Sequence, residues 1–335
     1  MIALIGVASL AFDTGYMYKT RNELQNIADA TALAAARSLG DVYTMHNAYI
    51  DSTDRPGILL TAQDVAQKNR AGGKSPIAIS SADLEFGIWN GIAFTVDRVQ
   101  PNAIRATIRR DGVANGPVGT FFGRVLGVNT VDLSAKATAA LSGQSTAKAV
   151  PPFAISSAHF EKYATDCDLP IDIKFTEDSA DCAGWHTFLN PEVNPGATIE
   201  QIFSDMLNGT FNHPLINLGD ELWFTRDPVN QAFDEVQAYY ALHNVGGELE
   251  MNVAIFNNGT YPFGCANPSP GVQNTPKTVI GFATIIIEDV LEIGGEKVIR
   301  AKTICNNAEE SRGNGYYAGN NMYFFTMGSI PSLVE

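Results

Sequence analysis

The apolar residues of this chain are concentrated at its start and then recur with helical spacing. Residues 1–12 carry no charge and are apolar apart from Ser9. The stretch from Asp13 to Leu39 contains no proline, is rich in alanine and is followed by Gly40, a residue typical of the position just past a helix end. This pattern predicts one helix over residues 2–39, roughly 57 Å long at ~1.5 Å per residue.

The apolar start needs a cover, because a helix that is apolar on all sides is surrounded by lipid or by other protein. Residues 1–12 are too few to span a bilayer, which takes ~20 apolar residues, and they lack the charged flank of a secretory signal. We therefore interpret them as the remaining half of a longer hydrophobic segment. Two covers stay open: copies of the same chain, or a membrane reached through a longer native N-terminus.

A stripe with three- and four-residue spacing continues the apolar start along the same helix, beside a row of alanines that permits close helix packing. Two interpretations stay open for this stripe. It packs against another copy, or, from Leu24 onward, it docks on the protein's own sheet, which we favour for that part. The residues expected to form the assembly surface are Ile2, Leu4, Ile5, Val7, Leu10, Phe12, Met17, Leu24 and Ile27.

Beyond Gly40 the pattern predicts a small helix-plus-β-meander domain over residues 41–142. Its first part, residues 41–57, is polar and is expected to be irregular. The predicted elements are helices over 61–70 and 117–126 and strands over 84–89, 92–98, 103–109 and 128–141, with Asn90-Gly91 as a hairpin turn. This domain is expected to pack on the long helix.

Residues 143–149 are small and polar and predict a linker into an outer domain over residues 150–335. The elements predicted there are helices over 198–207 and 230–242 and strands over 249–256, 279–290, 297–305 and 323–327, with the run Ile285-Ile286-Ile287 typical of a buried central strand. The expected fold class is α+β: a long N-terminal hydrophobic helix packed on a small antiparallel-sheet domain, followed by a larger mixed α+β, disulfide-bearing outer domain.

Composition and charge narrow the function. A chain of 335 residues with 45% hydrophobic and 17% charged residues folds into about two domains. With 36 acidic against 22 basic residues the net charge is −14, which repels a phosphate backbone. Arg105, Arg109 and Arg110 come nearest to a basic cluster, and their strand spacing places them at the edge of a sheet. We expect no nucleic-acid partner.

The four cysteines and an acidic run lie in the predicted outer domain. None forms a C-x-x-C pair, so we expect disulfides Cys167–Cys182 and Cys265–Cys305 in an oxidising compartment, with four reduced thiols as the alternative. Carboxylates crowd around the first pair. A calcium ion is therefore the one candidate cofactor, although a solvated acidic loop is the simpler interpretation. The candidate ligands are Asp166, Asp168, Asp172, Asp178 and Asp181.

We expect no catalytic residues. The five histidines lie far apart without an H-E-x-x-H pair, and no nucleophile-elbow, phosphate-loop or dinucleotide signature is present. Three function classes remain: a structural subunit of an extracellular filament, an envelope-anchored adhesin that contacts a surface through Tyr316 and Tyr317, and an envelope hydrolase without an evident nucleophile and base. The first is favoured.

The first helix resembles a known family. The segments Phe12-Asp13-x-Gly15, Leu24-Gln25-Asn26 and Ala28-Asp29-Ala30 are similar to the N-terminal signature of the TadE/TadG-like proteins of tight-adherence (Flp) pilus systems. Weaker similarity continues at Phe121-Phe122 and at Leu218-Gly219-Asp220. The resemblance implies an extracellular or envelope pilus protein that acts with copies of itself or with other pilus-assembly components. The upstream half of the family's hydrophobic segment is missing here, so processing and anchoring both stay open.

Overall fold

Two compact units make up the described part of the chain. The computed structural model describes residues 2–148, 150–158, 169–175, 183–190, 195–225, 230–256, 274–313 and 326–335, and for residues 2–9 the backbone alone. Unit 1 contains residues 2–142 together with 329–335. Unit 2 contains the described residues between Gly143 and Gly328. The stretch 329–335, which the sequence analysis assigns to the outer domain, is therefore part of unit 1.

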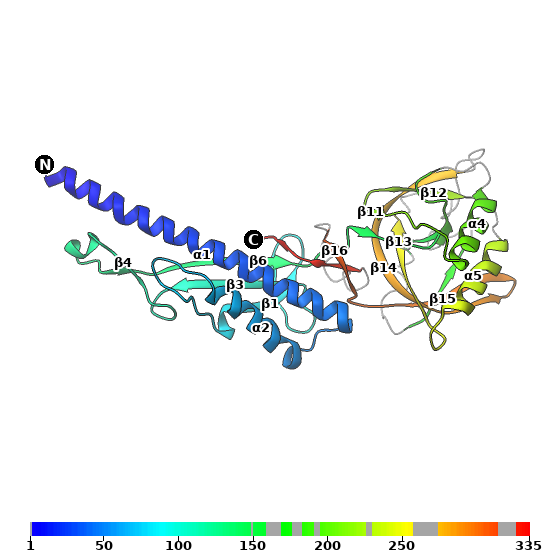
Figure 1. The fold of residues 1–335 in the computed structure, drawn as a ribbon, viewed down its shortest axis with the longest axis horizontal. Coiled ribbons are helices and arrows are strands. Elements are labelled where there is room, and N and C mark those ends of the chain that lie inside the picture. The colour runs from blue at the N-terminus through cyan, green and yellow to red at the C-terminus, as the bar shows by residue number, and fades with distance from the viewer. Residues whose placement is uncertain are drawn as a thin grey trace. The chain divides into compact units, whose positions relative to one another are not determined.

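Unit 1 is a long helix packed on an antiparallel sheet (Figure 1). Its elements are α1 (Ile2–His46), α2 (Asp51–Gln67), the 3-10 turn η1 (Ser81–Asp83), β1 (Leu84–Trp89), β2 (Phe94–Val96), β3 (Ala103–Arg110), β4 (Val118–Gly119), the 3-10 turn η2 (Gly123–Leu126), β5 (Thr130–Val131), β6 (Leu133–Ala140) and β18 (Ser332–Leu333). The five-stranded sheet has the order β18-β6-β3-β1-β2, and β4 pairs with β5 in a separate hairpin. The N-terminal end of α1 runs beyond the sheet, on the side where β4 lies.

Small side chains let α1 lie close to the sheet. The helix packs on β6 and β3, and α2 packs against it. Its buried face contains Leu24, Ile27, Ala28, Thr31, Ala32, Ala35, Ala36 and Leu39, and β6 and β3 present buried alanines in return. The expectation that the stripe from Leu24 onward docks on the protein's own sheet thus agrees with the structure.

The predicted end of the first helix is wrong, because α1 continues through Gly40 to His46. Val42 and Tyr43 in this last part are buried, and the Tyr43 hydroxyl donates to the Pro101 carbonyl at 2.8 Å. Gly40 does not end the helix; it allows a close backbone contact. A Cβ atom at this position would lie 2.6 Å from the Ser329 carbonyl oxygen, so glycine admits the C-terminal segment against α1.

The predicted meander is largely confirmed, whereas the second helix begins earlier than expected. The strand predicted over 84–89 is β1 itself, and the turn at Asn90-Gly91 is made by the Asn90 side chain, which accepts from the Ile92 and Ala93 amides. Residues 51–57 are the start of α2 rather than an irregular stretch. Asp54 stabilises that start by accepting from the Ile50 amide at 2.7 Å, and Pro56 lies within the helix.

Unit 2 is built around a seven-stranded sheet with two helices. Its elements are β7 (Thr146–Ala147), β8 (Phe153–Ser156), β9 (Ile171–Lys174), β10 (Ala183–Trp185), α4 (Pro195–Leu207), β11 (Ile216–Asn217), β12 (Glu221–Thr225), α5 (Asn230–His243), β13 (Leu249–Phe256), β14 (Asn274–Ile293), β15 (Glu296–Thr303), β16 (Ala308–Arg312) and β17 (Met327–Ile330), of which β17 leads the chain back to unit 1. The strand order is β10-β8-β13-β14-β15-β9, and β12 pairs with β14.

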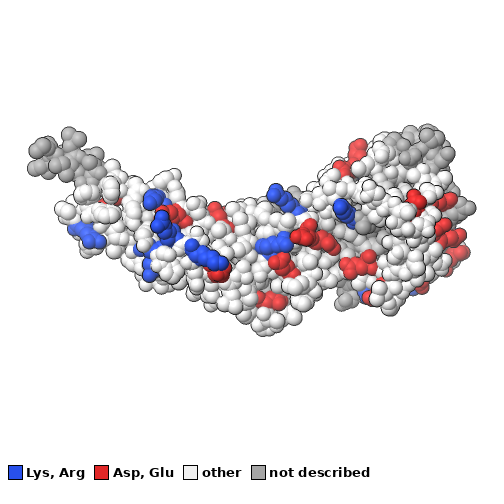
Figure 2. Space-filling view, in the orientation of Figure 1, with Lys and Arg blue, Asp and Glu red and all other residues white. Residues whose placement is uncertain are grey.

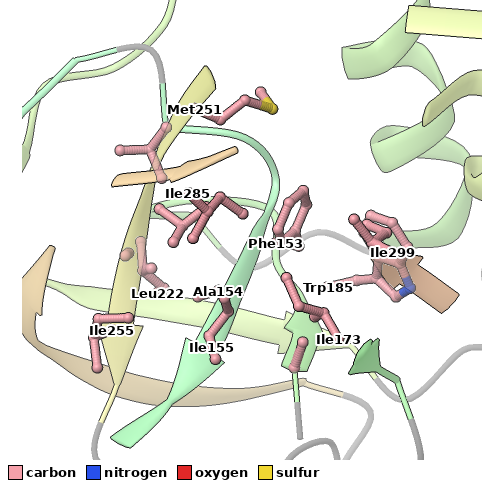
Figure 3. Close-up of a cluster of buried hydrophobic side chains, with 14 of the residues drawn as sticks. Phe153, Ala154, Ile155, Ile173, Trp185, Leu222, Met251, Ile255, Ile285 and Ile299 are labelled. Carbon is pink, nitrogen blue, oxygen red and sulfur yellow. The ribbon is translucent and has the colours of Figure 1, made fainter. Parts of the chain in front are cut away.

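The core of unit 2 lies between this sheet and the helices α4 and α5 (Figure 3). β14 is central and pairs with β13 and β15 in antiparallel fashion. The predicted central position of the isoleucine run is confirmed: Ile285 and Ile287 on β14 are buried, whereas Ile286 is only half-buried. Aromatic rings fill the space beside them: Trp185 stacks on Phe175 at 4.3 Å and meets Phe203 and Phe233 edge-on.

We expect Gly40→Ala to destabilise the protein by about 1–3 kcal/mol, because the new methyl group would force the Ser329 backbone away from α1. Gly15→Ala on the same helix is the matched control. No atom lies within 4 Å of a Cβ there, so the loss of glycine should stabilise the helix by up to ~1 kcal/mol. Urea unfolding of both variants measures the difference, and equal effects of the two substitutions would contradict the close approach.

His186 makes the stability of unit 2 depend on pH. Its ring is fully buried beside Phe188 and Phe224, and burial lowers its pKa from 6.5 to about 3. Below pH 6.5 the unfolded chain binds a proton at His186 that the folded chain does not bind. The free energy of unfolding therefore decreases as the pH is lowered from about 6.5 to 3, by up to ~1.4 kcal/mol per pH unit.

We expect His186→Phe to flatten this pH dependence, because the ring contacts stay and the titrating group is lost. Urea unfolding at a series of pH values from 7 to ~4 provides the slope. His243→Phe, at an exposed position of α5, is the control and should keep the slope of the unaltered protein. The same slope in both variants would show that His186 does not govern it.

Candidate functional site: the apolar end of unit 1

An exposed apolar surface lies where the N-terminal part of α1 meets the loop around η2. Leu10 and Phe12 on the helix are 63% and 57% exposed, and Val125 and Leu126 on the loop are 85% and 77% exposed. We call the set Leu10, Phe12, Phe121, Phe122, Val125 and Leu126 the apolar end. Monomeric proteins expose single apolar side chains routinely, whereas exposed apolar residues in contact with one another, as Phe12 is with Phe121 and Phe122, are typical of an interaction site.

Asp13 holds the loop to the helix. Its carboxylate accepts three backbone N–H groups, from Phe121 at 2.8 Å, Phe122 at 3.0 Å and Gly123 at 2.6 Å. Desolvation opposes ionisation of this nearly buried group, but the three hydrogen bonds outweigh it and hold the pKa of Asp13 below its ordinary value. Asp13 is thus a charged anchor for a segment more than a hundred residues away in the chain.

Ring contacts complete the junction. Phe12 meets Phe121 and Phe122 edge-on at centroid distances of 5.4 and 6.0 Å, and Tyr16 meets Phe121 at 5.6 Å. η2 then ends at Gly127, whose φ of 83° is the left-handed conformation that favours glycine. The loop therefore presents Val125 and Leu126 outward from a fixed base.

The apolar end is local. Further along α1 the exposed side chains include the polar Lys19, Asn22 and Asn26, together with Tyr18 and Met45. Met17 is half-buried, and Leu24 and Ile27 are buried within unit 1. Leu24 and Ile27 therefore offer no surface to another copy in this fold, which corrects their place in the expected assembly surface. The side chains of Ile2, Leu4, Ile5 and Val7 lie outside the described residues.

The sequence pattern does not predict the loop of the apolar end. It predicts one helix over residues 117–126, with Phe121-Phe122 part of the family resemblance, whereas the structure has β4 followed by the short turn η2. The available signal was the run of large apolar residues between Gly119 and Gly127, which is too short to be a core element. In the helix, Asp13 likewise carried no predicted role.

The other predicted sites fall largely on residues that are not described. Asp172 is described, and both its oxygens bind the Arg300 guanidinium, at 2.9 and 3.3 Å. Asp166, Asp168, Asp178 and Asp181 lie outside the described residues, as do Cys167, Cys182, Cys265, Tyr316 and Tyr317. Cys305 is not a free thiol. The disulfide pairing and the calcium site remain predictions; within the described ranges, no cluster of three possible metal ligands is found.

The expected edge position of the arginines is wrong, because all three lie on β3, the middle strand of the sheet, which pairs with β1 and β6. They serve the fold of unit 1. Arg109 binds Asp83 at 2.8 Å, and the buried Arg110 donates to the carbonyl oxygens of Gly72 and Gly116 at 3.0 and 2.8 Å. Among the helices of the described chain, none is both long and apolar enough to cross a membrane.

Charge is divided unequally between the two units. Residues 1–142 and 329–335 contain 13 basic and 13 acidic residues, whereas residues 143–328 contain 9 basic and 23 acidic ones. The whole net charge of −14 therefore belongs to the second group. Figure 2 shows the same contrast on one face: blue side chains are frequent over unit 1, and red ones dominate over unit 2.

These features define a class of protein: an α+β protein whose long N-terminal helix carries exposed apolar side chains near its start. Residues 1–38 match the family model described as putative Flp pilus-assembly TadE/G-like, and residues 20–139 match the one described as putative Tad-like Flp pilus-assembly. The resemblance is thereby confirmed over residues 1–139, which are similar to these two Flp pilus-assembly families. Neither a curated protein nor a solved structure matches the chain significantly.

We expect Asp13→Asn to release the loop of the apolar end while unit 1 stays folded. An amide accepts more weakly than a carboxylate, so hydrogen exchange at the Phe121, Phe122 and Gly123 amides should quicken by about tenfold or more. In the unaltered protein the lowered pKa of Asp13 preserves the anchor at neutral pH and loosens it only in acid, below the ordinary value of 3.8.

Asp97→Asn is the control for this substitution, because Asp97 makes a similar side-chain contact, to the Val99 amide, in another loop of unit 1. It should leave exchange at residues 121–123 unchanged. Unaltered exchange in Asp13→Asn would show that the aromatic contacts alone hold the loop.

Proposed function

We propose that the protein is a non-enzymatic structural subunit of a Flp pilus apparatus that associates with copies of itself through the N-terminal part of α1 and the apolar end. The observation that carries this proposal is the exposed set Leu10, Phe12, Val125 and Leu126 on a rigid base. Each large apolar side chain that leaves water contributes ~1.5 kcal/mol or more, so such a surface favours association strongly before ordering costs are subtracted.

The position of this surface supports contact at the helix end rather than along the whole rod. Beyond Tyr18 the exposed residues of α1 are mostly polar, with Ala30 and Met45 as exceptions, and its inward face packs on the sheet of unit 1. A neighbouring copy would therefore cover the first dozen residues and the loop together. Asp13 keeps these two parts in one place, which lowers the entropy lost when the contact forms.

A second candidate is a membrane-anchored envelope adhesin of the same pilus system. The observation that favours it is the combination of the apolar end with a neutral unit 1 and a strongly acidic unit 2. An anionic lipid surface would repel the acidic unit 2 but not the neutral unit 1. In this alternative a longer native N-terminus enters the bilayer and unit 2 contacts another surface.

Either role belongs in the cell envelope or outside the cell. The disulfides Cys167–Cys182 and Cys265–Cys305 fit that compartment and remain part of the proposal. A calcium ion at the acidic run also remains part of the proposal. One of its expected ligands, Asp172, is paired with Arg300. A non-enzymatic role fits pilus-assembly families and needs no catalytic group.

We expect Leu10→Asp combined with Leu126→Asp to abolish assembly, because two charges would have to be buried in the contact. Electron microscopy of material released from cells provides the test: the unaltered protein should form fibres, and the variant only single particles. Shedding of soluble monomer from an otherwise membrane-bound population would favour the anchored adhesin instead.

The matched control is Ile92→Asp combined with Val113→Asp. These residues are 87% and 84% exposed on unit 1 but lie in other loops, so fibres should persist. If the unaltered protein is a detergent-solubilised monomer without fibres under any condition, the proposed self-association is wrong.

A further inference from the structure

A cation-lined cavity lies on unit 1, away from the apolar end. It has a volume of about 440 Å³ and is half-open to solvent. Its lining comes from α1, from β3 and β6, and from the C-terminal segment: Arg21, Gln25, Arg105, Ser134, Ala135, Lys136, Thr138 and Glu335. Three cations against one carboxylate make it positive, in a chain whose net charge is −14.

Arg105 is a fixed cation of this cavity. Its Nε donates to the Thr138 hydroxyl at 3.0 Å, and its guanidinium lies over the Phe94 ring at 4.2 Å. The Glu335 carboxylate accepts from the same guanidinium and from the Thr138 hydroxyl. The bound Glu335 side chain therefore shows that the cavity accepts a carboxylate.

Arg21 and Lys136 are the cations that remain. Both are exposed, and neither forms an ion pair with any other described residue. Gln25, one turn after Arg21 on α1, donates to the Lys136 carbonyl at 3.0 Å and to Asp29 at 2.8 Å, which fixes the helix against this part of β6. The two cations thus flank a preformed opening beside the carboxylate that Arg105 already binds.

The C-terminal segment and α1 share the edge of β6 beside this cavity. β18 pairs with Ala139 and Ala140, and the chain continues this pairing as far as Thr138, whose amide donates to the Glu335 carbonyl at 2.7 Å. Ser134 and Lys136 precede the covered part of the strand. Because alternate residues of a strand present their backbone groups to the same edge, the Lys136 carbonyl lies on this edge too, and it accepts from the Gln25 side chain. The cationic side chains, rather than the strand edge, are therefore the groups that the cavity offers to a ligand.

We propose that this cavity binds a carboxylate-bearing segment of unit 2 from a second copy of the chain. Charge complementarity selects this occupant, since unit 2 carries an excess of 14 acidic residues over basic ones and unit 1 carries none. A contact between different surfaces of two copies is heterologous and can repeat without closing, which produces a filament rather than a dimer. The inference rests on the proposed self-association and names a second contact within it.

The test is the double variant Arg21→Glu and Lys136→Glu in the full chain. We expect its self-association, measured by analytical ultracentrifugation, to weaken by at least about tenfold and to lose most of its salt dependence. A short poly-glutamate peptide should compete with association of the unaltered protein and have no effect on the variant. Thermal unfolding should be unchanged, because both side chains are exposed.

Arg70→Glu combined with Lys74→Glu is the matched control, with the same change of charge at exposed positions of unit 1 outside the cavity. It should weaken association by less than about threefold. Equal effects of the two double variants, or none in either, would overturn the inference. So would poly-glutamate binding that leaves association unchanged. If Leu10→Asp with Leu126→Asp abolishes assembly while Arg21→Glu with Lys136→Glu preserves it, the proposed function stands and the cavity contact falls.

Discussion

The packing of α1 on the sheet of unit 1 is the contact on which the other features depend. Alanines on the helix and on the strands let α1 lie close to β6 and β3. Because Gly40 has no side chain, the C-terminal segment can also approach the helix. Most of the stability of a helix within a protein comes from packing of one face, which for α1 is the part from Leu24 to Leu39. The apolar end and the cation-lined cavity both have one wall on α1 and are positioned by the same contact.

Much of the fold could be predicted because its elements are strongly periodic. The strands β1 and β13 have the predicted bounds, and the central position of β14 follows from its isoleucine run. The end of α1 could not be predicted, because Gly40 looks like a helix stop until the approach of Ser329 is known. The start of α2 could not be predicted either, because Pro56 and Gly57 suggest a loop, yet both lie within the helix.

The candidate site illustrates a different limit. Its helical half was expected, since the apolar start is visible in the sequence, but its loop half depends on a carboxylate that binds three amides a hundred residues away. No spacing rule connects Asp13 to Phe121. Leu24 and Ile27 show the converse: the same periodicity serves docking within one chain or between two, and only the tertiary structure decides that these two residues face inward.

The return of β18 to the sheet of unit 1 makes unit 2 an insertion between β6 and the final strand. Residues 2 and 335 therefore belong to the same unit. A tensile load applied between these two residues would be carried by the helix and by the β6–β18 pairing, and it would bypass the folded core of unit 2. An inserted unit of this kind can change its surface, or its sequence, without altering the mechanical path through its host.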